Sequence, residues 1–88
     1  MITVKKQDVG NWLLIDYLST LYTIREKLRF FEGKYHHAWE KFETESLTSL
    51  KEDFDLWDDF IEWKAYVKMS KELSFKIDEV RHGNFEIA

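Results

Sequence analysis

The 88-residue sequence contains no cysteine and no proline, and it has only three glycines. Without cysteine, the chain has no disulfide framework, no thiolate nucleophile and none of the thiolate ligands that structural zinc sites use. No apolar run reaches the roughly 18 residues that a membrane span needs. The lysine-containing segment after Met1 is also unlike the apolar core of a signal peptide. We therefore expect a cytoplasmic protein that makes no membrane contact.

The charge balance argues against a general nucleic-acid binder. Acidic residues outnumber basic ones by 17 to 13, which gives a formal net charge of −4, whereas phosphate recognition needs clustered Lys and Arg. Lys5 and Lys6 leave DNA contact open, but two lysines alone do not support it. With 44% hydrophobic residues the chain is able to fold. An acidic surface of this kind is suited to a basic protein partner.

The segment between Gly10 and Gly33 predicts a long helix, because its apolar residues recur at spacings of three and four in a heptad-like, coiled-coil pattern. This seam consists of Leu14, Tyr17, Leu21, Ile24, Leu28 and Phe31. Further apolar residues widen the stripe: Trp12, Leu13, Leu18, Tyr22 and Phe30. Such a helix is packed on two sides. We expect it at about residues 9–32, with Asp8 or Asn11 as N-cap and Gly33 as C-terminal cap.

Two more helices are predicted after Gly33. A short one at about residues 36–45 carries Trp39 and Phe42, and a turn follows in the polar cluster around residues 44–49. A second long helix is expected at about residues 50–82, with Gly83 as its C-terminal cap. Its seam consists of Leu56, Phe60, Trp63, Tyr66, Ser70, Leu73, Ile77 and Val80. We assign Trp63 and Tyr66 on this seam to the core.

The expected fold is all-α and forms one domain over residues 1–88. It is an antiparallel hairpin of two long helices, with a short connecting helix and short extended termini. The tail at residues 84–88 alternates apolar and polar positions, as an extended arm does, and residues 2–4 can do the same. These two ends can pair with each other or add to the sheet edge of a partner. We also expect a homodimer, because two helices alone cannot bury both seams and their flanks.

Neither a metal site nor a catalytic site is expected. His36 and Glu40 stand four apart, as metal ligands on a helix do, but no third ligand follows at a suitable spacing. There is no glycine-rich phosphate loop and no nucleophile motif around any serine. We therefore expect a protein that is not an enzyme and that uses no cofactor.

The start of the second long helix is the strongest candidate for partner binding. Here carboxylates alternate with aromatic residues, as in Phe54, Trp57 and Asp58. Acidic residues at a helix start complement the helix dipole, and the same residues can form an acidic rim around an aromatic contact surface. Both interpretations stay open. For Trp57 and Ile61, a place at the edge of the core and a place in a protein interface are about equally favoured.

Three stretches carry a resemblance to known proteins. They are residues 25–35 leading into residues 39–43, then residues 54–66, and finally Arg81-His82-Gly83-Asn84-Phe85-Glu86-Ile87. Together they resemble small helical antitoxin-like proteins of archaeal and bacterial toxin–antitoxin gene pairs. The shared features are amphipathic helix patterns and the Gly-Asn tail. The resemblance covers most of the chain.

The resemblance implies a protein that neutralises a cognate toxin, such as a basic ribonuclease, by direct binding. A helix and an extended tail would wrap the toxin, and the expected contacts are Phe54, Trp57, Asp58, Ile61, Phe85 and Ile87. Many antitoxins also carry a DNA-binding module that represses their own operon, but this sequence has no helix-turn-helix or basic ribbon. The alternative is a structural or scaffolding helical homodimer that has no toxin partner.

Overall fold

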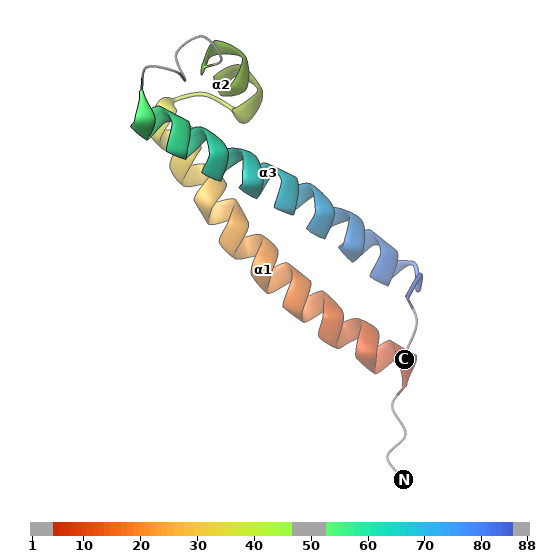
Figure 1. Ribbon diagram of the computed structural model, residues 1–88. Coiled ribbons are helices and arrows are strands. Elements are labelled where there is room, and N and C mark those ends of the chain that lie inside the picture. The colour runs from red at the N-terminus through yellow and green to blue at the C-terminus, as the bar shows by residue number, and fades with distance from the viewer. Residues whose placement is uncertain (1–4, 47–52, 86–88) are drawn as a thin grey trace.

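The computed structural model describes residues 5–46 and 53–85, which form three helices (Figure 1). They are α1 (Lys6–Tyr35), α2 (Trp39–Ser46) and α3 (Phe54–Arg81). No strand occurs within these two ranges, and the predicted all-α class is confirmed. The expected pairing of residues 2–4 with the tail lies outside the described residues, as does Ile87. The predicted turn at residues 44–49 begins too early, because residues 44–46 belong to α2. The other two predicted helices also begin too early: α2 begins at Trp39 rather than at about residue 36, and α3 begins at Phe54, after its cap residue Asp53, rather than at about residue 50.

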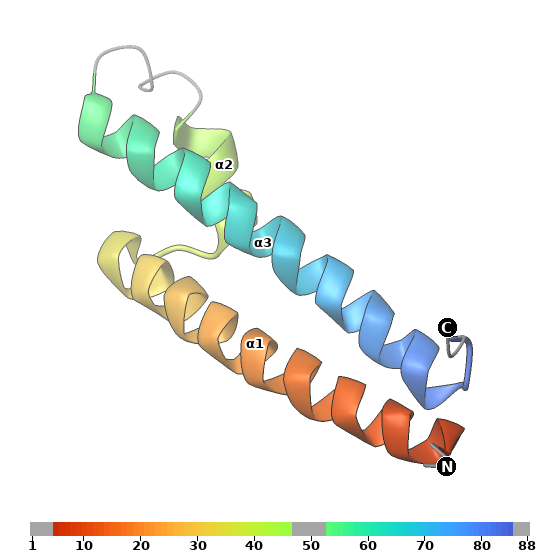
Figure 2. The same ribbon diagram turned by 60° about the horizontal axis from the view of Figure 1, so that its bottom comes forward.

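The two long helices lie side by side and run in opposite directions (Figures 1 and 2). At one end, a Cβ atom on Gly10 would lie 3.7 Å from Cγ1 of Val80. At the other end, the rings of Phe31 and Trp63 stack with their centroids 5.5 Å apart. The molecule measures 61 × 19 × 18 Å, and its radius of gyration is 17.6 Å. A compact domain of this length would have a radius of gyration of about 12 Å, so the protein is a rod.

The buried positions confirm both predicted seams. On α1 the most deeply buried side chains are Leu21, Ile24 and Phe31, and on α3 they are Phe60, Trp63, Ile77 and Val80. The other apolar seam residues are half-buried along the same lines. Trp63 is completely buried, as predicted, whereas Tyr66 is only half-buried.

Helix α2 completes an aromatic cluster at one end of the rod. Its Trp39 lies 5.2 Å from Phe60, and its Phe42 lies 4.6 Å from Trp63, both measured between ring centroids. Full burial of one such side chain stabilises a fold by roughly 1.5–3 kcal/mol. The apolar core of the rod is therefore thickest at the α2 end, where Phe31 also packs.

The predicted start and end of the first helix are wrong. Gly33 lies inside α1, and His36 takes the left-handed conformation after the helix, with φ of 57°. The extra turn is held because the Tyr35 ring packs 4.4 Å from Phe42, and this contact outweighs the tendency of glycine to end a helix. At the start, Lys5 is the cap residue and makes no side-chain capping bond, while Asp8 lies in the first turn. There its charge complements the helix dipole.

The ends of α3 follow the local sequence. The side chain of Asp53 caps the helix by accepting a hydrogen bond from the N–H of Leu56, at 3.1 Å. The helix ends at Arg81, and Gly83 then adopts a positive φ of 72°. Glycine is favoured there because it takes this conformation without steric cost.

Candidate interaction surface

The first two turns of α3 expose an apolar patch that consists of Phe54, Trp57 and Ile61, which we call the α3 patch. Phe54 is 87% exposed, and the other two side chains are nearly half exposed. Their spacings of three and four place them on one side of the helix, away from the buried Trp63. Asp58, the fourth predicted contact residue on this helix, is also exposed. The structure therefore brings these four predicted residues together at one end of the rod.

The α3 patch has an acidic border. Between positions 53 and 62 the chain carries five carboxylates and no basic residue: Asp53, Asp55, Asp58, Asp59 and Glu62. All except Asp59 are exposed. An aromatic centre with a charged rim is a common composition of protein interfaces. Here the rim is acidic at the start of the helix, and the exposed Lys64 lies one turn beyond Ile61 on the same side.

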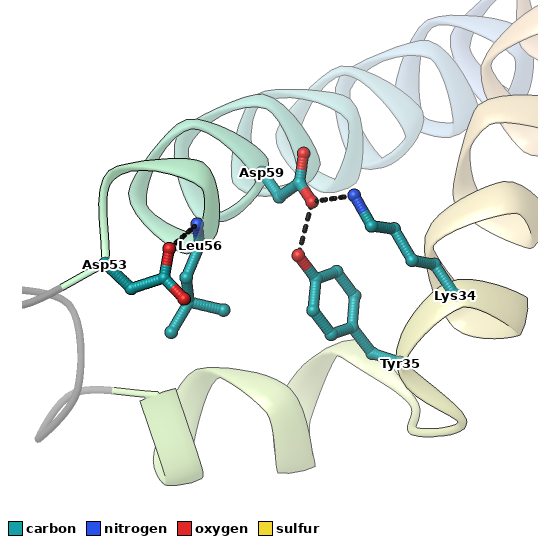
Figure 3. A network of polar contacts seen from close by, with 5 residues as sticks. All are labelled: Lys34, Tyr35, Asp53, Leu56 and Asp59. Carbon is teal, nitrogen blue, oxygen red and sulfur yellow. Dashed lines mark hydrogen bonds and ion pairs between the residues drawn. The ribbon is translucent and has the colours of Figure 1, made fainter.

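Asp59 faces the opposite way and joins α3 to the end of α1 (Figure 3). One oxygen, Oδ2, accepts a hydrogen bond from Lys34 Nζ at 2.6 Å and another from the hydroxyl of Tyr35. Both donors come from the last turn of α1, so the network fixes this turn against the start of α3. Nothing in the local sequence distinguishes Asp59 from the neighbouring carboxylates, so the network was not predicted.

The network shifts the pKa values of its three members. Burial acts to raise the pKa of Asp59, but the hydrogen bonds from Lys34 and Tyr35 outweigh it, so this pKa lies below its usual value. The hydrogen bond to Asp59 raises the pKa of Lys34. Burial raises the pKa of Tyr35, and its bond to Asp59 raises it further. The three groups are thus held as carboxylate, ammonium and neutral phenol around neutral pH.

The tail residue Phe85 lies at the other end of the rod, against the first turns of α1. Its ring would touch a Cβ atom on Gly10 at 3.0 Å, and Lys6 Nζ lies 5.0 Å from the ring centroid. Phe85 also lines a pocket of about 470 Å³ between the two helix ends. Twenty residues of helix separate Ile61 from Arg81, which is about 30 Å. The predicted contacts therefore fall into two separate places, and the sequence could not show that Phe85 folds back onto α1.

Two of the three histidines, His36 and His37, lie at the connection between α1 and α2, and His82 follows the end of α3. Nε2 of His37 lies 3.1 Å from Oε2 of Glu45, an ion pair when the imidazole is protonated. Within residues 5–46 and 53–85, no three His, Asp or Glu side chains are grouped closely enough to hold a metal ion. In the same ranges, no helix is long and apolar enough to cross a membrane.

A second apolar surface lies on α1 and was not among the predicted contact residues. Trp12, Ile15 and Tyr22 are each at least 60% exposed, and Leu18 is 43% exposed. We call these four residues the α1 outer face. Its sequence signal is the set of apolar residues at positions 12, 15, 18 and 22, whose spacings of three and four place them on a side of the helix away from the core seam.

In comparisons with models of protein families, with curated proteins and with solved structures, nothing matches this chain.

Proposed function

We propose that the chain is a non-enzymatic protein-binding module, the antitoxin of a toxin–antitoxin pair, which neutralises a partner toxin by direct contact. The single observation that carries the proposal is the α3 patch, where Phe54, Trp57 and Ile61 are exposed beside four exposed carboxylates. In this proposal the antiparallel helix pair is a rigid hairpin that presents the patch, and the termini are extended arms.

The partner that suits this surface is a basic protein, such as a ribonuclease that must itself bind RNA. Complementary charge steers association and selects the partner, while desolvated aromatic side chains supply most of the affinity. Asp58 belongs to the charged rim, and Trp57 is the expected anchor. Phe85 and Ile87 would add a second contact if the tail leaves α1 when the toxin binds.

The proposed module acts in the cytoplasm as a homodimer and needs no cofactor. A second candidate function is a scaffolding homodimer without a toxin partner. The exposed α1 outer face favours this alternative, because self-association alone would explain that surface. The two proposals differ in the role of the α3 patch. The antitoxin proposal requires this patch for toxin binding, whereas the scaffolding proposal does not.

A growth assay tests the proposal. The protein encoded beside this chain is induced in cells with or without the chain, and the antitoxin proposal predicts that growth arrest is relieved only when the chain is present. Trp57→Ala should lose the rescue, because truncation of an aromatic anchor typically costs 2 kcal/mol or more of binding free energy. Met69→Ala is the matched control, since Met69 is on the same helix and has the same 45% exposure.

The proposal is wrong if Trp57→Ala rescues growth as well as the wild-type chain at equal protein levels. It is also wrong if the neighbouring protein causes no arrest and forms no complex with the chain. In that case the scaffolding candidate takes its place.

A further inference from the structure

The first half of α1 is apolar around most of its circumference. Between Trp12 and Ile24 the only charged residue is Asp16. One line of this segment, which includes Leu21 and Ile24, is buried against α3. At 3.6 residues per turn, Ile15 and Tyr22 lie roughly opposite that line. A helix segment that is apolar on two opposite sides is packed against other structure on both sides. Here α3 packs against only one of them.

The exposed area of the chain is large enough for a stable interface. The chain exposes 6966 Å², whereas a compact protein of its mass exposes about 5500 Å². The excess of roughly 1500 Å² exceeds the approximately 800 Å² per partner that a specific interface buries. The α1 outer face contributes to this excess with three side chains that are at least 60% exposed.

The distribution of charge indicates which binding partner covers the α1 outer face. Packing of the α3 patch on its own copy is disfavoured, because four exposed carboxylates lie between positions 53 and 62 and a two-fold axis would set like charges against each other. The α1 outer face carries less charge, since Asp16 is the only charged residue between Trp12 and Ile24. Its flanks carry both signs, with Lys5, Lys6 and Asp8 before it and Arg25, Glu26 and Arg29 after it.

We propose that a second copy of this chain covers the α1 outer face, and that the two α1 helices pack antiparallel about a two-fold axis near residue 17. In this arrangement the segments from Trp12 to Ile24, in which Asp16 is the only charged residue, lie along each other in the two copies. Trp12 of one copy lies beside Tyr22 of the other, and Ile15 lies beside Ser19, whose small side chain permits close approach of the helices. In this register Asp8 lies opposite Glu26 of the other copy, and Arg25 and Arg29 of that copy lie within one turn of Asp8.

This inference goes beyond the proposed toxin site, because it does not require a toxin and it leaves the α3 patch exposed on both copies. The two claims can fail separately. A chain that is monomeric but still rescues growth would overturn only the dimer, and a dimer that does not rescue growth would overturn only the toxin site.

Light scattering after size exclusion tests the dimer. The wild-type chain should have the mass of two copies at 10–100 μM, whereas Ile15→Glu and Tyr22→Glu should each raise the dimer Kd at least tenfold. Both side chains are highly exposed within one copy, so circular dichroism should show unchanged helicity. Phe75→Glu is the matched control, because Phe75 on α3 has the same 65% exposure as Ile15, and this variant should remain dimeric.

Spin labels test the antiparallel orientation, since a chain without cysteine accepts one label at a chosen position. We suggest Thr20→Cys, which is exposed and outside the proposed contact, and Gly33→Cys, because a Cβ atom at Gly33 meets nothing within 4 Å. In the antiparallel dimer, labels at position 20 should lie within about 25 Å of each other, and labels at position 33 should lie about 50 Å apart. A parallel dimer would bring both pairs within about 25 Å.

The proposal is overturned if the wild-type chain is a monomer at 100 μM, or if Ile15→Glu and Tyr22→Glu dimerise as tightly as the wild-type chain. A short distance at both labelled positions would overturn the antiparallel arrangement.

Discussion

At the scale of single residues, the carboxylate of Asp59 joins two helices through one oxygen atom, which accepts hydrogen bonds from Lys34 and Tyr35. Because the Lys34 side chain is 46% exposed, solvent screens its attraction to Asp59, and its contribution to stability is smaller than that of a buried ion pair. The network matters mainly because it fixes the start of α3, where the α3 patch lies.

We predict that Asp59→Asn reduces the dependence of stability on pH. The pKa of Asp59 is lowered in the folded chain, so its contribution is present above about pH 4 and is lost as the pH falls through the folded pKa. The pKa values of Lys34 and Tyr35 are raised. Their contributions are present below about pH 10 and are lost as the pH rises through the folded values. Thermal unfolding from pH 2 to 11 measures both limbs.

In this experiment the wild-type chain should lose more stability below pH 4 than the Asn variant, which keeps an acceptor oxygen but no charge. Equal acid limbs for the two chains would show that the network contributes nothing to stability. Asp58→Asn is the matched control, because Asp58 is adjacent in sequence and exposed.

The two helical glycines give a second prediction at this scale. Gly33→Ala should stabilise the chain by about 0.5–1 kcal/mol, because alanine favours a helix interior and its Cβ atom would meet nothing within 4 Å. Gly10→Ala should gain less, since its Cβ atom would press on the Phe85 ring at 3.0 Å. Urea unfolding of both variants compares them. An equal gain would show that Phe85 does not rest on Gly10 in solution.

At the scale of helices, sequence spacing predicted the faces better than the ends. Both seams and the grouping of Phe54, Trp57 and Ile61 follow from a period of 3.6 residues, which is a local property. The end of α1 depends instead on Tyr35 and its distant partners Phe42 and Asp59. The position of Phe85 depends on where α3 ends beside α1. Contacts of this kind join residues far apart in the chain, so the local pattern does not encode them.

The N-cap of α3 gives a prediction at the scale of helices. Asp53→Ala removes the acceptor for the N–H of Leu56 and should destabilise the chain by about 1 kcal/mol. In this variant, hydrogen exchange in the first turn of α3 should become faster than in the wild-type chain. Exchange in the centre of α3 should change less, because the cap holds only the first turn. Unchanged exchange at Leu56 would contradict the capping role. Asp55→Ala, which leaves the cap intact, is the control.

At the scale of the whole molecule, the rod separates two exposed apolar surfaces. The α3 patch lies at the α2 end and has an acidic border, while the α1 outer face lies along the other half of the rod and carries little charge. A basic partner and a second copy can therefore bind at the same time. The toxin-binding proposal and the dimer proposal together predict a complex that contains two copies of this chain and a bound toxin.

The most direct test of the central claim is the mass of the particle that forms when the chain is co-expressed with the protein encoded beside it. Light scattering after size exclusion at low and high salt should give a mass that includes both proteins. The complex should dissociate more at high salt, because charges of opposite sign contribute to its stability. A particle that contains only copies of this chain at both salt concentrations would contradict the account.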